Sequence, residues 1–393
     1  MTLSEVLNLP TTARPGPRLG GVGVSGAVPF VTSPGARPLA EAIAYRVFKA
    51  LPRIIEDSSF VSACRLCNTD VLLGLWLKTQ PMTMSIHDWI RSMSDSRRRK
   101  ALLRAHYARL ARGRDHNNYG IISPFTKEEL LDGFSQTPEG PNSEGKMYVA
   151  RLIQAPHDET HLDAGPFLKP LVYTLKEVWN HENWIFYASV TPKKLDKWLQ
   201  RVRGAATWFW SDYSAFDATY SEQAWDMLEG LYRVIYPDSE ISLWKALAVW
   251  RRPHGKRHVS KEDIILEYFA NVCNASGRDD TALANALFNG IVLSLSFASA
   301  LSGHSIADLT EGDLLFASDL CNIAIVGDDS LVACDFDVSP LLPAIERCIC
   351  SFGLSAKVEW STSLHDVTFL GMMPYRVGEE YHWGPTLGRR LYK

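Results

Sequence analysis

The chain has 393 residues, of which 46% are hydrophobic, 11% are aromatic and 22% are charged. This length allows two or three domains or one large composite domain, and the composition excludes a wholly disordered, collagen-like or coiled-coil protein. Lysine and arginine number 41 against 44 acidic residues, which gives a net charge of -3. A nucleic-acid partner would therefore have to be held by local basic patches and not by bulk charge.

Seven scattered cysteines are too few for a disulfide scaffold and predict a reducing, intracellular compartment. Cys64 and Cys67 have zinc-knuckle spacing, but no second Cys or His pair in the sequence completes four ligands, so we expect structural cysteines. The N-terminus does not have the pattern of a signal peptide. The apolar stretch 282–301 contains Asn, Gly and Ser, and it predicts a buried helix instead of an intrinsic transmembrane segment.

Residues 1–40 are rich in Pro and Gly, which predicts a flexible N-terminal arm. Helical patterns follow, and residues 91–114 contain nine Lys or Arg against one acid, Asp95. This run is either a solvated helix face or a surface for the RNA backbone, and the shortage of acids within it limits internal pairing. The candidate RNA-binding residues are Arg97, Arg98, Arg99, Lys100 and Arg104. A second basic segment, 251–261, is predicted to be a loop.

A strand-like run at residues 207–210 precedes two acids, Asp212 and Asp217. Apolar residues at helical spacing follow, and Thr219 and Glu222 would form the capping box of that helix. We therefore expect Asp212 at a strand end and Asp217 in the turn beyond it.

A hairpin is predicted where the apolar strands 323–326 and 330–333 flank Gly327, Asp328 and Asp329. Gly and Asp also occupy turns for purely local reasons. Apolar strands on both sides indicate burial, however, and adjacent carboxylates there repel each other unless cations or solvent exposure relieve them. Together with an acid at another strand end, this arrangement suits two Mg²⁺ ions and phosphoryl transfer.

Three ordered segments resemble motifs A, B and C of viral RNA-dependent RNA polymerases: Asp212-x4-Asp217, Ser276-Gly277-x3-Thr281-x3-Asn285 and Gly327-Asp328-Asp329. Upstream, the segment from Arg151 to Leu171 is similar to motif F of positive-strand polymerases, most of all to tombusvirus-like and nodavirus-like enzymes. Downstream, residues 352–359 resemble motif D and residues 369–374 resemble motif E. The resemblance covers roughly residues 120 to 375.

The resemblance implies a catalytic centre in which Asp212 and Asp328, with Asp329 beside them, bind two Mg²⁺ ions, for which Mn²⁺ could substitute. Lys357 would protonate the leaving pyrophosphate, unless it is only an exposed strand lysine. The 2′-OH is both donor and acceptor, so an acid paired with an amide suits its recognition. The implied substrate-binding residue for the triphosphate is Arg151, with Lys127 and Lys146 as further candidates unless they are only solvated charges. For the ribose they are Asp217 and Asn285, supported by Ser276, Gly277 and Thr281.

The implied fold is α+β, a right-hand polymerase with fingers, a palm built on an antiparallel sheet and a short thumb. After the arm, the expected domains are fingers with an N-terminal helical region (41–200), a palm (201–375) with a fingers insertion at about 236–272, and a thumb remnant or C-terminal tail (376–393). Only 64 residues follow Asp329, fewer than the family normally has. The thumb is therefore minimal, or supplied by a partner chain, or lost from a truncated reading frame.

The implied function is template-directed synthesis of viral RNA from NTPs. A reverse transcriptase shares the palm, but Gly327 and Asn285 oppose that alternative because such enzymes usually have an aromatic residue before the two Asp and lack this Asn. A non-catalytic RNA-binding replication protein is opposed by the intact carboxylates. The expected partners are RNA template and product, NTPs, and an accessory viral replication protein that supplies a membrane anchor or the missing thumb. The expected location is the host cytoplasm, at membrane-associated replication sites.

Overall fold

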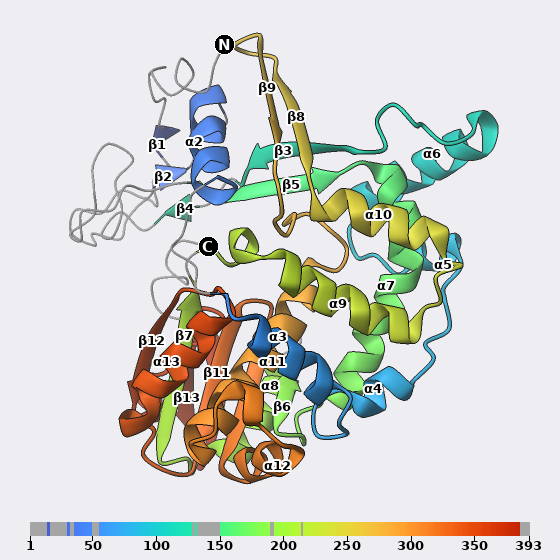
Figure 1. Ribbon diagram of the computed structural model, residues 1–393. Coiled ribbons are helices and arrows are strands. Elements are labelled where there is room, and N and C mark those ends of the chain that lie inside the picture. The colour runs from blue at the N-terminus through green and yellow to red at the C-terminus, as the bar shows by residue number, and fades with distance from the viewer. Residues whose placement is uncertain are drawn as a thin grey trace.

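The computed structural model describes residues 14–15, 30–31, 35–48, 55–127, 130–131, 150–188, 192–213 and 215–385. These residues form a mixed α+β fold with several sheets, in agreement with the predicted class (Figure 1). Most of the predicted N-terminal arm lies outside the described residues, and so does Lys146.

Helices account for more of the described residues than strands do. They are α2 (Ala36–Arg46), α3 (Asp57–Cys67), α4 (Gly74–Lys78), α5 (Ile86–Arg91), α6 (Ser96–Arg112), α7 (Asp158–Val178), α8 (Pro192–Val202), α9 (Glu222–Ile235), α10 (Ile241–Arg251), α11 (Thr281–Ser302), α12 (Glu311–Leu320) and α13 (Leu342–Ser351). Short 3-10 turns lie at Phe216–Thr219, Ile306–Asp308, Ser339–Leu341 and Leu364–Asp366. A small sheet pairs β1 (Arg14–Pro15), β2 (Phe30–Val31) and β4 (Leu130–Leu131).

The central sheet has the strand order β12-β7-β11-β10-β6. Its strands are β6 (Ile185–Tyr187), β7 (Thr207–Tyr213), β10 (Cys321–Val326), β11 (Asp329–Cys334) and β12 (Ala356–Ser361). Four of them pair antiparallel, but β6 runs parallel to β10, so the sheet is mixed where an antiparallel one was predicted. No tight turn joins β6 to β10, since a long stretch of chain separates them, and this leaves their relative direction free.

Both faces of β7 are buried. Phe209 and Tyr213 belong to the main hydrophobic core beside α11, whereas Trp208 belongs to a second core beside α8. Successive side chains of a strand point to opposite faces of its sheet, so this strand contributes to both cores. Burial on both faces explains the continuous run of large apolar residues that the sequence shows.

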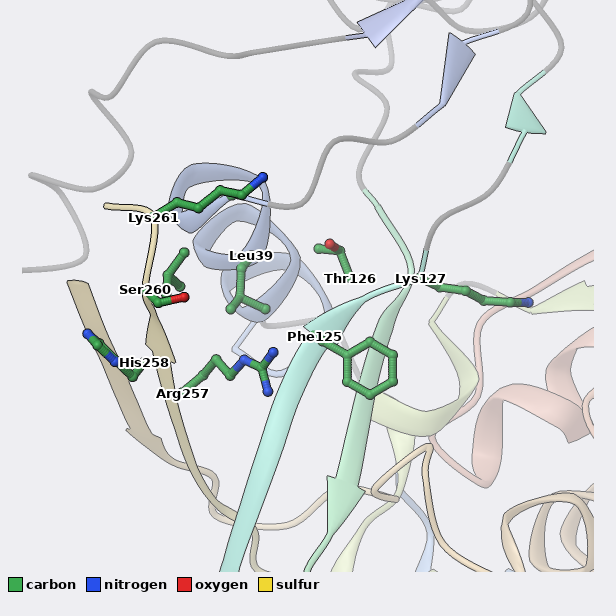
Figure 2. Close-up of a pocket in the computed structure, with 10 residues that line it drawn as sticks. Leu39, Phe125, Thr126, Lys127, Arg257, His258, Ser260 and Lys261 are labelled. Atoms are coloured by element: carbon green, nitrogen blue, oxygen red, sulfur yellow. The ribbon is translucent and has the colours of Figure 1, made fainter. Parts of the chain in front are cut away.

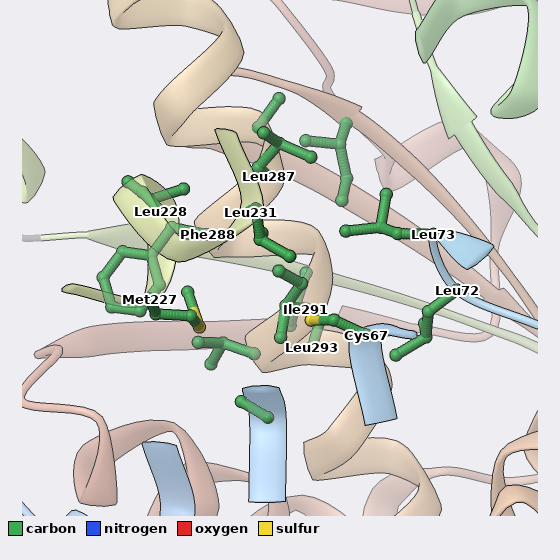
Figure 3. Packing of buried hydrophobic residues seen from close by; sticks show 14 of the residues in the cluster. Cys67, Leu72, Leu73, Met227, Leu228, Leu231, Leu287, Phe288, Ile291 and Leu293 are labelled. Atoms are coloured by element: carbon green, nitrogen blue, oxygen red, sulfur yellow. The ribbon is translucent and has the colours of Figure 1, made fainter. Parts of the chain in front are cut away.

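The helix α11 is the centre of the main core. Every residue from Leu283 to Ser299 is buried, and in Figure 3 Leu287, Phe288 and Ile291 lie among side chains of the neighbouring helices. It is the one helix in the described ranges that is long and apolar enough to span a membrane, but 89% of its apolar stretch is buried inside the fold. Such burial is typical of a core helix, so the prediction of a buried helix is confirmed.

The other face of the central sheet is covered by α8 and a hairpin formed by β13 (Met372–Val377) and β14 (Glu380–Pro385). Gln200 of α8 donates a hydrogen bond from Nε2 to the backbone oxygen of Tyr381 at 2.5 Å. The described part of the predicted thumb remnant, 376–393, thus lies in this hairpin and in contact with α8, and residues 386–393 lie outside the described residues.

A four-stranded sheet has the order β5-β3-β8-β9 and carries α2. Its strands are β3 (Ile121–Thr126), β5 (Leu152–Pro156), β8 (His254–Val259) and β9 (Ile264–Phe269). The prediction of a loop at 251–261 is therefore wrong, because this segment includes β8 and the start of the β8–β9 hairpin. Alternate residues of β9, such as Leu266 and Tyr268, are buried and hold this hairpin in the sheet. Leu39 of α2 packs in the same core as Leu152 of β5.

The basic segment forms α6, and its two sides differ. On the α7 side, Arg98 pairs with Asp158, and Arg109 Nη1 lies 2.6 Å from Asp163 Oδ1. Acids of α7, from outside the segment, therefore neutralise this side, although the segment itself has only one acid. Among the candidate RNA-binding residues, Arg97, Lys100 and Arg104 stay exposed and are called the exposed stripe, while Arg99 is half-buried. Their spacing of three and four residues places the stripe on one helix face.

Candidate active site

The catalytic candidates surround the turn between β10 and β11. These strands pair in register up to Val326 opposite Asp329, which leaves Gly327 and Asp328 as the two turn residues. Gly327 has a φ of 63°, a conformation that favours glycine, and Asp328 is not among the residues of positive φ. Positive φ at the first turn position only is the pattern of a type II′ hairpin turn. The predicted hairpin is confirmed.

Asn289 of α11 ties the turn to the main core. Its Nδ2 donates hydrogen bonds to the backbone oxygens of Asp328 at 2.9 Å and of Gly327 at 3.3 Å. Its Oδ1 accepts a hydrogen bond from the Tyr213 hydroxyl at 2.8 Å. Because Asn289 is fully buried, these bonds fix the turn relative to β7. Sequence reasoning missed this residue, although it lies one helical turn after Asn285.

Charged residues form a row across the central sheet beside the turn. Ser211 of β7 pairs with Ser330 of β11, so the next step of the same ladder places Asp212 opposite Asp329. On the other side of β7, Lys357 of β12 is directly opposite Asp212. Residues opposite each other in antiparallel strands project from the same face. The topology therefore brings two predicted metal ligands and the predicted proton donor together.

Electrostatics at Asp328 favours the binding of a cation. The surrounding protein displaces water from its carboxylate and raises its pKa, the nearby charge of Asp212 raises it further, and Arg151 and Arg46 lower it. Asp212 and Asp328 both keep exposed surface, so a hydrated ion can reach them. A cation between the two carboxylates would relieve their repulsion, and oxygen ligands are those that Mg²⁺ prefers.

The carboxylates do not form a complete metal site by themselves. In the ranges that the structure describes, no three His, Cys, Asp or Glu side chains are close enough to hold a metal ion. Magnesium is commonly bound by one or two carboxylates with substrate phosphates and water as the other ligands. Asp212 and Asp328 fit that kind of site, which is completed by its substrate.

Lys357 lies at the edge of this row with 71% of its side chain exposed. Its Nζ is 2.7 Å from Oε1 of Glu359, two residues along the same strand. The lysine would have to leave this surface ion pair to reach a leaving group, and exposed pairs of this kind are weak.

Asp217 and Asn285, the predicted ribose-binding pair, lie in hydrogen-bond contact. Nδ2 of Asn285 donates to Oδ1 of Asp217 at 3.0 Å. Nδ2 of Asn274, a residue that sequence reasoning missed, donates to the same oxygen at 3.2 Å. Within the described part of the chain, Oδ2 of Asp217 accepts no hydrogen bond, so this oxygen is available for a ligand hydroxyl.

Burial raises the pKa of Asp217 to about 6. The charge of Asp328 also raises it, whereas the hydrogen bond from Asn285, the charge of Arg278 and the hydrogen bond from Asn274 lower it. At neutral pH the carboxylate is therefore ionised and acts as an acceptor.

The helix after Asp217 begins differently from the prediction. Ser221 is its N-cap, and the Ser221 Oγ accepts a hydrogen bond from the backbone nitrogen of Ala224 at 3.2 Å. Thr219 Oγ1 instead donates to the backbone oxygen of Phe216 at 2.7 Å. The predicted capping box is wrong because a 3-10 turn precedes the helix and takes up Thr219.

The motif B loop is held against β5. Ser276 Oγ donates to the backbone oxygen of Leu152 at 2.8 Å and accepts from the backbone nitrogen of Gln154 at 3.2 Å. The Gly277 nitrogen donates to the Gln154 oxygen at 3.1 Å, and a Cβ at this glycine would lie 2.4 Å from that oxygen. Thr281 Oγ1 donates to a backbone oxygen of the same loop at 3.1 Å. These three candidates hold the loop in place.

Arg151 and Lys127 are neighbours at the ends of β5 and β3. The backbone nitrogen of Lys127 donates to the backbone oxygen of Arg151 at 2.8 Å, and both residues are exposed. Because the charge of Arg151 lowers the pKa of Asp328, its guanidinium acts on the turn that bears the carboxylates. Lys146, the third triphosphate candidate, lies outside the described residues.

Arg46, in the last turn of α2, is a further cation that sequence reasoning missed. Its charge also lowers the pKa of Asp328. Among the described residues its Nε is buried without a hydrogen-bond partner, and its guanidinium lies 5.6 Å from the ring centre of Tyr45. The N-terminal third has no motif that could identify this arginine, so only the packing of α2 on β5 reveals it.

A basic cavity of about 580 Å³ opens beside Lys127 (Figure 2). It lies between α2, β3 and the tip of the β8–β9 hairpin, and Figure 2 shows the Arg257 side chain extending toward Leu39 and Phe125. His258 and Lys261 also line it, and none of its described lining residues is acidic. The cavity therefore suits an anionic ligand.

Residues 180–389, more than half of the chain, match the family model described as viral RNA-dependent RNA polymerase. The matched range contains the central sheet, α11, the row of charged residues and the Asp217–Asn285 pair. It does not include Arg151, Arg46 or α6. No curated protein matched the chain.

Proposed function

Because the chain belongs to the viral RNA-dependent RNA polymerase family, it is an RNA-directed RNA polymerase of viral replication, and we propose that the turn between β10 and β11 is its catalytic centre. The observation that carries this proposal is that Asp212 of β7 lies beside the hairpin turn that bears Asp328 and Asp329. Polymerases of this family act on an RNA template with NTPs and generally use Mg²⁺.

Asp212 and Asp328, with Asp329 beside them, would hold two Mg²⁺ ions, or Mn²⁺ in their place. When bound, such ions lower the pKa of the attacking hydroxyl and neutralise charge on the leaving group. The 3′ oxygen of the primer or first nucleotide bonds to the α-phosphorus of the NTP while its hydroxyl proton passes to water. The bond from the α-phosphorus to the oxygen that bridges to the β-phosphate breaks, and pyrophosphate leaves. Lys357, released from Glu359, would give a proton to that pyrophosphate. The buried Asn289 contacts keep the turn rigid during this exchange.

The nucleotide would lie between β5 and α11. Arg151, with Lys127 and Lys146 as further cations, would bind the triphosphate, since a guanidinium fork matches phosphate oxygens. Oδ2 of Asp217 would accept from the ribose 2′-OH, and the second N–H of Asn285 Nδ2 would donate to it. The loop of Ser276, Gly277 and Thr281 would keep this pair at a fixed distance from the triphosphate site.

The exposed stripe of α6 would bind the RNA backbone outside the active site. The side chains of the stripe are exposed, and within the described helix no acid lies on the same face to pair with them. Arg98 is excluded from this role because it is paired with Asp158.

The finer features of the family resemblance belong to the same proposal. They are a positive-strand lineage of the tombusvirus-like or nodavirus-like kind, a right-hand layout, and a membrane anchor on an accessory viral replication protein. That partner would place the polymerase at membrane-associated sites in the host cytoplasm. The order of the motifs supports the lineage.

The experiment is RNA-templated primer extension with Mg²⁺, comparing four ribonucleotides with four deoxyribonucleotides. We expect RNA products from ribonucleotides alone and none from the Asp328→Asn protein. Synthesis of DNA at a similar rate would support the reverse-transcriptase alternative. RNA binding without any synthesis would support the non-catalytic alternative.

Sugar recognition has its own test. Asn285→Ala removes one of the two proposed contacts to the 2′-OH, so kcat/KM for a ribonucleotide should fall while that for its deoxy counterpart changes little. A site that hydrogen-bonds a hydroxyl rejects the analogue without it by up to ~10⁴-fold. The ratio of kcat/KM for the ribonucleotide to kcat/KM for its deoxy counterpart should therefore fall by roughly ten to a hundredfold. An unchanged ratio with a lower melting temperature would mean that Asn285 is only a buried structural amide.

A further inference from the structure

A buried ion pair lies directly behind the Asp217–Asn285 pair. Arg278 Nε and Nη2 donate to the two carboxylate oxygens of Asp280 at 2.8 and 2.5 Å, and both side chains are fully buried. Arg278 Nη1 donates to Oδ1 of Asn274 at 2.9 Å. The guanidinium carbon lies 4.1 Å from the ring centre of Trp225 and 5.2 Å from that of Trp250. These rings restrict the guanidinium to one position.

This arrangement fixes the orientation of two amides in succession. A guanidinium is a donor only, so Asn274 must present Oδ1 to Arg278, and its Nδ2 then faces the sugar pair. That Nδ2 donates to Oδ1 of Asn285 at 2.7 Å, and the Tyr220 hydroxyl donates to the same oxygen at 2.9 Å. With its oxygen occupied, Asn285 must turn Nδ2 toward Asp217 and the place proposed for the ribose.

We propose that Arg278 and Asn274 are positioning residues that set the choice between ribonucleotides and deoxyribonucleotides without contacting the nucleotide. The inference rests on the proposed role of Asp217 and Asn285 in binding the 2′-OH. A rotated Asn285 would place its oxygen against the Asp217 carboxylate and lose the donor that the hydroxyl needs. The charge of Arg278 also favours ionised Asp217, the form that accepts from the hydroxyl.

The test is the variant Asn274→Asp, which is nearly isosteric and keeps an acceptor for Arg278. The new side chain has a second acceptor where Nδ2 was a donor, so Asn285 is drawn to rotate its Nδ2 toward position 274. The ratio of kcat/KM for a ribonucleotide to that for its deoxy counterpart should fall about tenfold, mainly through the ribonucleotide. Asn274→Ser shortens the side chain and puts one hydroxyl in place of the amide, so it should lower the ratio less, and it decides the question if Asn274→Asp does not fold.

Tyr232→Phe is the matched control. It removes the hydrogen bond from the Tyr232 hydroxyl to Oδ2 of Asp280, 3.1 Å long, at the far end of the same network. It should lower the melting temperature and leave the nucleotide ratio unchanged, as expected for a purely structural contact.

The possible outcomes separate the two proposals. A ratio that falls in Asn274→Asp and in Asn285→Ala supports the positioning role. If Asn285→Ala lowers the ratio but folded Asn274→Asp does not, the positioning role is overturned and the sugar site stands. If neither variant changes the ratio, the sugar site itself is wrong.

Discussion

Asn285 on α11 donates a hydrogen bond of 3.0 Å to Asp217, which precedes it by 68 residues in the chain. The contact joins the turn after β7 to the central helix of the core. Burial raises the pKa of Asp217 to about 6 despite this bond. Between the ordinary pKa of 3.8 and this value, the folded protein holds a proton that the unfolded chain has released.

The first prediction follows from this difference in bound protons. Because the folded state binds more protons in that window, the contribution of Asp217 to stability falls as pH rises from about 4 to about 6. Asp217→Asn cannot titrate, so its free energy of unfolding, relative to that of the wild type, should rise by about 2 kcal/mol between pH 4.5 and pH 7. Urea unfolding of both proteins at the two pH values measures this. If the two proteins differed in free energy of unfolding by the same amount at both pH values, Asp217 would not take up a proton on folding.

The second prediction concerns the metal ligands. Asp212→Asn and Asp328→Asn each replace a carboxylate with an amide of the same size. Each should lower the rate of synthesis by several orders of magnitude and leave the fold intact. Mg²⁺ should raise the melting temperature of the wild type and not that of either variant. Primer extension and thermal melts with and without Mg²⁺ measure both effects.

Asp319→Asn is the control for the metal prediction, because Asp319 is an exposed acid at the end of α12 and outside the row of charged residues. It should retain full synthesis and the full response to Mg²⁺. Near-normal incorporation by Asp212→Asn or Asp328→Asn would remove that residue from the metal site.

The third prediction separates the two sides of α6. Changing Arg97, Lys100 and Arg104 together to Gln should weaken RNA binding for all sequences and flatten its salt dependence by ~0.7 in log-log slope for each phosphate that the protein no longer neutralises. Arg98→Gln should instead lower stability and leave the slope unchanged, since it leaves Asp158 without its partner. A salt titration of RNA affinity measures both variants, and equal slopes for the triple variant and the wild type would make the stripe a solvated face.

The fourth prediction concerns the close approach of the motif B loop to β5. Gly277→Ala would place a Cβ 2.4 Å from the backbone oxygen of Gln154, which cannot move without shifting β5, so it should destabilise the protein by roughly 1–3 kcal/mol. Gly230→Ala, in the open middle of α9, meets no atom within 4 Å and should stabilise by up to about 1 kcal/mol. Urea unfolding compares the two, and equal effects would contradict the steric argument.

Local patterns in the sequence determined much of the active site. The hairpin, the buried helix, and the places of Asp212 at a strand end and Asp217 in a turn follow from alternation, turn residues and spacing over short stretches, and the structure shows each of them. The ordered motifs also identified the polymerase family, which the match over residues 180–389 shows.

Only the tertiary structure decided the partners of these residues. The acids that neutralise one side of α6 come from α7, the parallel strand β6 joins an otherwise antiparallel sheet, and Arg46 acts on the turn from a helix without a motif. Asn274 and Arg278 have no spacing that reveals their link to Asn285. Hydrogen bonds and charges act over a few ångströms in space, and the chain order of such partners is free to vary, so their identity depends on packing and not on sequence pattern.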